Sequence, residues 1–110
     1  MSDHEDNFDY RFNKFLEKVQ EKVKTRDTEY SRHSVDFTIG KRYIRVIDVT
    51  NSKVSHLKRE SVFCFVDVTN GNVLKANSWK APETKNPRSN IGDEDFGESG
   101  ISDYGAVYLR

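Results

Sequence analysis

Residues 75–82, Lys-Ala-Asn-Ser-Trp-Lys-Ala-Pro, combine cations with the only tryptophan of the chain. Further cations follow shortly after, with one acid, Glu83, among them. In proteins that bind single-stranded nucleic acid, lysines follow the phosphates while an aromatic ring stacks on a base, worth ~1–3 kcal/mol per base. This pattern predicts a nucleic-acid contact surface made of Lys75, Asn77, Trp79, Lys80, Lys85 and Arg88.

The same segment has a purely structural interpretation, which the residue types alone favour. Trp79 would close one end of the core, and the lysines would keep an edge strand from associating with other chains. The acidic stretch 93–103 carries five acids and no base. It could fold back on the basic segment or mimic nucleic acid.

Side chains that could support catalysis or bind a metal are few and scattered. His4, His33 and His56 share no metal-binding spacing, and the lone Cys64 lies in an apolar run that is typical of a buried thiol. The acids at 93–95 lack the spaced oxygen ligands of a calcium loop. Phosphate-binding glycine loops, dinucleotide fingerprints and nucleophile elbows are missing from the sequence. We therefore expect a non-enzymatic protein without a metal or cofactor.

Length and composition indicate one small domain, residues 1–110, because 110 residues support a single core. With 35% hydrophobic and 33% charged residues that core is thin, so self-association would help to bury apolar surface. Eighteen basic and eighteen acidic residues balance, which leaves nucleic-acid binding to a local patch. The N-terminus is acidic, and apolar runs stay far short of the ~20 residues of a membrane span. We expect a cytosolic protein with no membrane partner.

A helix is predicted over about residues 7–25, followed by an antiparallel β-meander over about residues 34–82. Apolar residues repeat with a 3.6-residue period in the first segment, which indicates one buried helix face. Alternating and β-branched runs indicate the strands, and Asn70-Gly71 predicts a two-residue type I′ turn between two of them. The helical stripe consists of Phe8, Phe12, Phe15, Leu16, Val19 and Val23.

The strand around residues 62–68 is apolar on both faces, which predicts either a central sandwiched strand or a subunit contact. Residues 83–103 are polar almost throughout and predict a long loop, either functional or disordered. Residues 104–110 are apolar again and predict a short final strand or an anchored terminus.

Several of these segments resemble a family of small proteins from cyanophages and marine metagenomes. The similarity is carried by Val-Phe-Cys-Phe-Val-Asp at 62–67, Thr-Asn-Gly-Asn-Val-Leu-Lys at 69–75, Ser-Trp-Lys-Ala-Pro at 78–82, Arg88 with Asn-Ile at 90–91, and Tyr-Gly-Ala-Val-Tyr-Leu-Arg at 104–110. It covers residues 61–110 well and the first half only in pattern.

The resemblance implies an Sm-like fold, α+β and mainly β: an N-terminal helix on a strongly bent, five-stranded antiparallel small barrel of the SH3-like kind, assembled as a homo-oligomeric ring. It further implies RNA or single-stranded DNA binding in phage nucleic-acid processing, in the cytoplasm of the infected bacterium. The uridine-binding loop and the Arg-Gly pair of true Sm proteins are missing here, so uridine specificity is not implied. Alternatives are a structural virion or scaffold protein and an inhibitor of a host defence protein.

Overall fold

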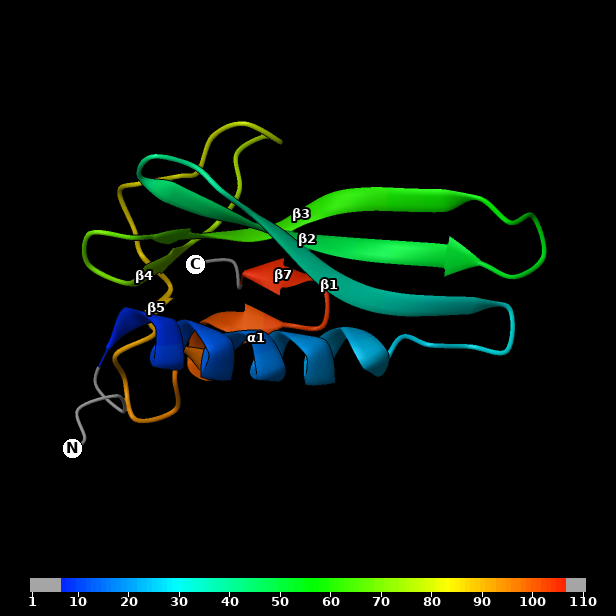
Figure 1. The fold of residues 1–110 in the computed structure, drawn as a ribbon, viewed down its shortest axis with the longest axis horizontal. Coiled ribbons are helices and arrows are strands. Elements are labelled where there is room, and N and C mark those ends of the chain that lie inside the picture. Colours follow the sequence, from blue (N-terminus) through cyan, green and yellow to red (C-terminus); the bar gives the residue numbers. More distant parts are fainter. Residues whose placement is uncertain (1–6, 107–110) are drawn as a thin grey trace.

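A computed structural model describes residues 7–106 of the chain. One helix precedes a series of antiparallel strands, and the helix lies across one face of the resulting sheet (Figure 1). The elements in chain order are α1 (Phe8–Lys24), β1 (Ser31–Ile39), β2 (Tyr43–Ser52), β3 (Lys58–Asp67), β4 (Asn72–Leu74), β5 (Ser89–Asn90), the 3-10 turn η2 (Glu98–Gly100), β6 (Ile101–Ser102) and β7 (Gly105–Ala106).

The helix predicted from the apolar stripe is confirmed as α1. Asn7 caps it, because its side-chain Oδ1 accepts a hydrogen bond from the Tyr10 N–H at 2.8 Å. Four members of the stripe are buried in the core, and Phe8 and Leu16 pack against that core half-buried. The buried four are Phe12, Phe15, Val19 and Val23.

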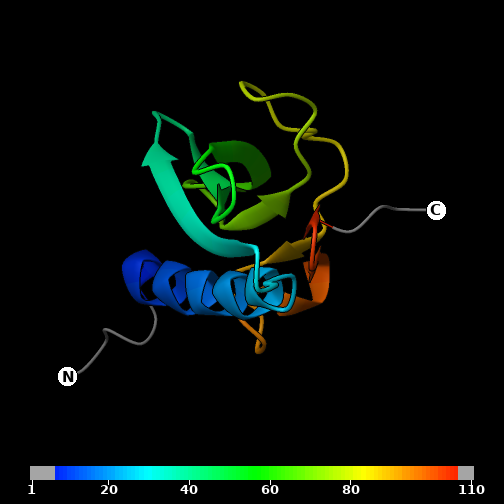
Figure 2. The same ribbon diagram turned by 90° about the vertical axis from the view of Figure 1, so that its right-hand side faces the viewer.

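The five strands β1 to β5 form one antiparallel sheet in sequence order, and β6 and β7 form a separate pair. The sheet bends over the helix, as the end-on view shows (Figure 2), but it does not close. This corrects the expected barrel while confirming the α+β, mainly-β class. The chain leaves the sheet after Leu74 and returns only for the two residues of β5, so the edge opposite β1 is too short to reach it.

A β-bulge explains why β3 is apolar on both faces. Val46 of β2 pairs with Cys64 and the next residue, Ile47, pairs with Val62, so Phe63 has no partner in β2. Phe63 and Cys64 therefore both contribute to the core on the helix side. Phe65 is buried too, and its ring contacts that of Tyr43 edge-on at 6.4 Å. The apolar faces of β3 are thus covered within one chain, without a subunit contact.

The turn between β3 and β4 lies where it was predicted but is not of type I′. A type I′ turn needs positive φ at both central residues, and only Gly71 has it, at 81°. The turn is longer because the Asp67 side chain accepts the Thr69 N–H at 2.9 Å and the Asp67 carbonyl accepts the Gly71 N–H at 2.7 Å. These bonds fold residues 68–71 into a wider turn.

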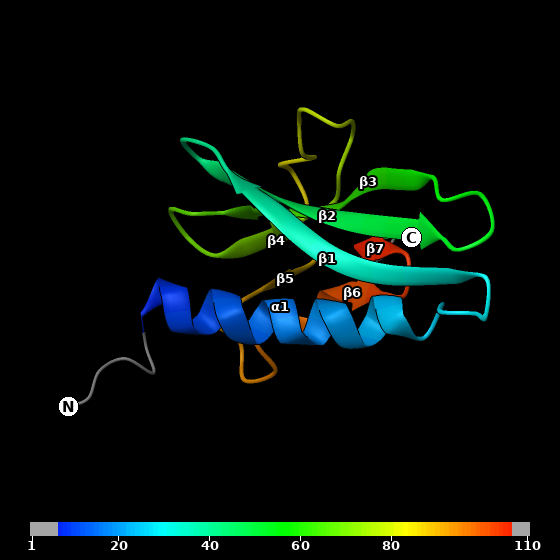
Figure 3. The ribbon, with the colours of Figure 1, turned by 45° about the vertical axis from the view of Figure 1, so that its right-hand side comes forward.

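The segment 83–103, expected to be a long loop, contains β5, η2 and β6 and packs against the helix (Figure 3). Glu98 forms ion pairs with Lys18 and Lys22 of α1, at 3.6 and 3.8 Å between nitrogen and oxygen. The final strand predicted over 104–110 is the short β7, which pairs with β6 rather than with the main sheet. Residues 107–110 lie outside the described part of the chain.

Asp67 is a buried acid that holds the β3–β4 turn and the start of β2 together. Its carboxylate accepts hydrogen bonds from the Thr69 hydroxyl at 2.6 Å and from Arg42 Nε at 3.2 Å. Burial by itself would raise the pKa of Asp67, but the hydrogen bonds from Thr69 and Arg42 outweigh it and leave that pKa below its ordinary value.

We therefore expect Asp67→Asn to change how stability depends on acid. The ionised carboxylate stabilises the folded chain fully above the ordinary carboxyl pKa of about 4, and this stabilisation is lost as the pH falls through the lowered folded-state pKa. Urea unfolding from neutral to acid pH should show the largest deficit of the variant at neutral pH, shrinking below about pH 4. The exposed Asp36→Asn serves as a control that keeps the acid slope of the unaltered chain. A constant deficit at all pH values would contradict the prediction.

Candidate nucleic-acid interface

Residues 77–81 form a tight turn that projects from the sheet after β4 (Figure 1). The N–H groups of Asn77 and Ser78 both donate to the Ala81 carbonyl, at 3.0 and 3.1 Å. The Ser78 hydroxyl accepts hydrogen bonds from the N–H groups of Lys80 and Ala81, each at 3.2 Å. Trp79 lies at the tip of this turn with 42% of its surface exposed. The turn therefore presents an aromatic ring to solvent in a fixed loop.

Arg45 of β2 fixes this turn to the sheet. Its Nε donates to the Trp79 carbonyl at 2.7 Å, and its Nη1 donates to the Thr38 hydroxyl at 2.9 Å. The guanidinium carbon lies 4.9 Å from the centre of the Trp79 ring and 5.9 Å from that of Phe65. Trp79 thus has one face covered by a cation of its own chain, while part of its surface remains open.

A groove of about 310 Å³ runs between this turn and the β1–β2 connection. None of the residues that line it is acidic. Arg42 is 61% exposed in its side chain, although its Nε binds Asp67, and it lies over the Tyr43 ring with its guanidinium carbon 5.4 Å from the centre. The groove is therefore lined by four cations and two aromatic rings: Lys41, Arg42, Arg45 and Lys80 with Tyr43 and Phe65.

The structure places some of the predicted site residues at the Trp79 turn and the groove, and others away from them. Asn77 and Trp79 are exposed at the turn, and Lys80 is exposed and lines the groove. Lys75 is half-buried, with its Nζ 3.4 Å from the Ala76 carbonyl. Lys85 is exposed on the connection that follows. Trp79 does not close the core, as the structural interpretation supposed, because it stacks on Arg45 at the surface.

The structure places Arg88 differently from the prediction. Only 4% of its side chain is exposed, and its guanidinium is ion-paired with Glu83 and bonded to the Asn86 carbonyl. Its backbone N–H also donates to the Val73 carbonyl at 2.8 Å. Arg88 therefore holds the connection 83–88 against the sheet, and its charge is paired with that of Glu83.

Three cations of the groove escaped the sequence-based prediction: Lys41, Arg42 and Arg45. No local pattern showed that β2 starts beside the Trp79 turn. The contact between Arg45 and Trp79 spans 34 positions of sequence. A basic residue two places after Tyr43 on the same strand face was the only local signal.

A comparison with models of protein families matches residues 5–109 to a family of unknown function, DUF7717. The chain belongs to the DUF7717 family. No curated protein and no solved structure matches it. Within the described part of this DUF7717 chain, no helix is long and apolar enough to cross a membrane.

Changing Arg45 to alanine should uncover the second face of Trp79. The guanidinium covers that face, so its loss is expected to raise the rate at which acrylamide quenches the tryptophan fluorescence. Arg42→Ala is the matched control, because Arg42 stacks on the Tyr43 ring and not on the single tryptophan. Equal quenching of all three proteins would show that Arg45 does not cover the ring in solution.

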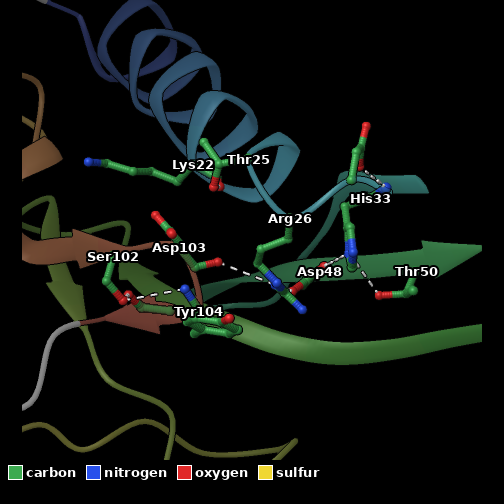
Figure 4. Close-up of polar contacts among 11 residues, drawn as sticks. Lys22, Thr25, Arg26, His33, Asp48, Thr50, Ser102, Asp103 and Tyr104 are labelled. Atoms are coloured by element: carbon green, nitrogen blue, oxygen red, sulfur yellow. Dashed lines mark hydrogen bonds and ion pairs between the residues drawn. The ribbon is translucent and has the colours of Figure 1, made fainter. Parts of the chain in front are cut away.

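A second polar cluster of this DUF7717 protein joins the end of α1 to β1 and β2 (Figure 4). Arg26 bonds to the Asp48 carboxylate at 2.5 Å, and its guanidinium lies 4.6 Å from the centre of the Tyr104 ring. His33 Nδ1 lies 3.0 Å from the Thr50 hydroxyl and 3.7 Å from Asp48 Oδ1. The Thr50 hydroxyl and the Asp48 carboxylate thus both face Nδ1 of His33. In a catalytic triad the nucleophile hydroxyl contacts one ring nitrogen of the histidine and the carboxylate contacts the other, so this cluster does not have the geometry of a triad.

The remaining residues considered for chemistry are placed as follows. Cys64 is buried, and burial raises the pKa of its thiol far above the ordinary value, so it stays protonated. Residues 7–106 contain no group of three or more His, Cys, Asp and Glu side chains arranged to hold a metal ion. His4 lies outside that range.

Proposed function

We propose that this protein binds single-stranded nucleic acid, RNA or DNA, in the groove beside Trp79 and acts without catalysis. The observation that carries the proposal is the meeting of the Trp79 turn with the cationic start of β2, two segments far apart in sequence. The open part of Trp79 would stack on a base, and Lys41, Arg42 and Lys80 would follow the phosphates. The phage origin and Sm-like kinship implied by the resemblance stay predictions.

The chemistry of the groove favours a single strand over a duplex. Stacking on Trp79 requires a base that is free of its neighbours, which a single strand offers at little cost. The groove also holds Arg45 in place before any ligand arrives, because it is bonded to both Thr38 and the Trp79 carbonyl. A preformed site of this kind loses little conformational freedom on binding.

The alternative that the acidic stretch 93–103 mimics nucleic acid receives less support from the structure. Both carboxylate oxygens of Asp95 accept backbone N–H groups, from Gly97 at 3.1 Å and Ser99 at 2.9 Å. Glu98 is committed to its ion pairs with α1. Asp95 and Glu98 therefore hold the segment 93–103 in shape, and only Asp93 and Glu94 of its five acids are exposed.

Assembly as a ring through the β1 edge would also have to displace existing contacts. The N–H of His33 donates to the Asp27 side chain at 2.7 Å, and that of Phe37 donates to the Asp36 side chain at 2.8 Å. Side chains that occupy backbone donors protect an edge strand from pairing with another chain. Nucleic-acid binding by a single chain is therefore the simpler proposal.

The experiment that tests the proposed function is a titration of a fluorescent single-stranded oligonucleotide at several salt concentrations. If three cations contact phosphates, the logarithm of the affinity should fall with the logarithm of salt with a slope of roughly −2. A duplex of the same length should bind more weakly. Binding that ignores salt, or prefers the duplex, would contradict the proposal.

A further inference from the structure

The β2–β3 hairpin turn lies at the opposite end of β2 from the β1–β2 connection (Figures 1 and 3). A second hollow, of about 300 Å³, lies at this turn. β2 connects it to the groove: from Arg45 to Ser52 the strand rises about 23 Å at ~3.3 Å per residue. The hollow is therefore separate from the proposed nucleic-acid site. Its lining is Thr50, Ser52, Ser55, Leu57 and Arg59.

The serine hydroxyls of this hollow are oriented by the hairpin backbone. Ser52 Oγ accepts a hydrogen bond from the Ser55 N–H at 3.2 Å, and Ser55 Oγ accepts one from the Leu57 N–H at 3.4 Å. Each oxygen thus acts as an acceptor toward its own chain, which leaves its hydroxyl hydrogen to donate elsewhere. The third hydroxyl, of Thr50, lies 3.0 Å from His33 Nδ1.

Arg59 supplies the charge of the hollow. It stands directly opposite Thr50 in the β2–β3 ladder, so the two side chains share one face of the hairpin. The neighbouring Lys58 forms an ion pair with Glu60, 3.5 Å between Nζ and Oε2, on the other face. Among residues 7–106, by contrast, no acid is paired with Arg59.

We propose that this hollow binds a phosphate group, held by the Arg59 guanidinium and the hydroxyls of Ser52 and Ser55. A guanidinium fork matches two phosphate oxygens at once, and the hydroxyl donors reach the others. The lining contains no carboxylate, so nothing in it repels an anion. Leu57 of the lining and Val54 of the same hairpin turn are exposed, at 66% and 70%, so the phosphate could be free in solution or displayed on a lipid surface.

The test is a titration of the full chain with inorganic phosphate, followed by the amide resonances of residues 52, 55 and 59, with chloride at equal ionic strength as the reference. We expect saturable shifts at these residues that chloride does not produce. Arg59→Gln should weaken binding by about tenfold or more, since it removes charge-assisted hydrogen bonds. Arg32→Gln, an exposed arginine bonded to the Thr28 carbonyl, is the matched control and should bind as the unaltered chain does.

Vesicles of phosphatidylcholine with and without phosphatidic acid distinguish the two sources of phosphate. Retention on phosphatidic-acid vesicles that Arg59→Gln abolishes would assign a lipid headgroup. Saturable phosphate shifts without vesicle retention would assign a soluble phosphate compound. Absence of both, or equal loss in the Arg32 and Arg59 variants, would overturn the proposal. Arg59→Gln should leave oligonucleotide binding in the groove unchanged, so the two proposals fail independently.

Discussion

Trp79→Ala is expected to weaken the binding of a single-stranded oligonucleotide by about 1–3 kcal/mol, roughly 5- to 150-fold, because it removes the ring on which one base stacks. The loop itself should survive, since Arg45 bonds to the backbone carbonyl of residue 79, which alanine retains. Fluorescence anisotropy of a labelled oligonucleotide measures the change directly. The loss should be nearly the same at low and high salt, because stacking carries no charge.

Two control variants separate stacking from a general loss of aromatic surface. Trp79→Phe keeps a smaller ring at the same place and should recover part of the affinity. Tyr30→Ala removes an aromatic side chain that is 61% exposed outside the groove and should have no effect. If Trp79→Ala binds as well as the unaltered chain, the groove is not where the nucleic acid lies.

Phe15→Ala should produce the largest loss of stability, about 3–5 kcal/mol, which is typical for a buried phenylalanine. Phe15 is fully buried, contacts Phe12 with its ring at 6.4 Å between centres, and lies under the segment around Gly97. Removing it leaves a cavity between the helix, the sheet and the 93–100 segment. Urea unfolding monitored by circular dichroism gives the change in the free energy of unfolding.

Val54→Ala is the control for this prediction, because Val54 is 70% exposed and surface substitutions change stability by only about 0.5 kcal/mol. A loss of less than about 1 kcal/mol for Phe15→Ala would mean that α1 is not packed on the sheet as described. The folded fraction of Phe15→Ala should still bind oligonucleotide normally, since Phe15 lies in the core and does not line the groove.

The helix and the order of the strands could be predicted because their signals are local. A 3.6-residue apolar period and a capping asparagine specify α1 wherever the chain packs. The type of the β3–β4 turn could not be predicted, because Asp67 and Thr69 on the strand side compete with the Asn-Gly preference. The openness of the sheet depends on where the chain travels between Leu74 and Ser89, and composition does not encode that path.

One half of the candidate site, the Trp79 turn, could be predicted from the sequence. The run of cations around a tryptophan is a local pattern and singled out Trp79 and Lys80, although the residue types alone favoured a structural role for the ring. It also suggested Arg88, whose pairing with Glu83 depends on how the connection folds. The other half of the groove comes from Arg42 and Arg45, and Arg45 reaches Trp79 only because β2 passes beside the turn. Long-range register decides that contact, and one sequence does not reveal it.

The central claim is that the Trp79 turn and the start of β2 form one nucleic-acid surface. Its most direct test is a titration of isotope-labelled protein with a short single-stranded oligonucleotide, followed residue by residue through amide chemical shifts. The account predicts saturable shifts that cluster at residues 38–45 and 77–81 and leave the β2–β3 hairpin tip unchanged. Shifts that avoid these two segments, or none at saturating oligonucleotide, would contradict it.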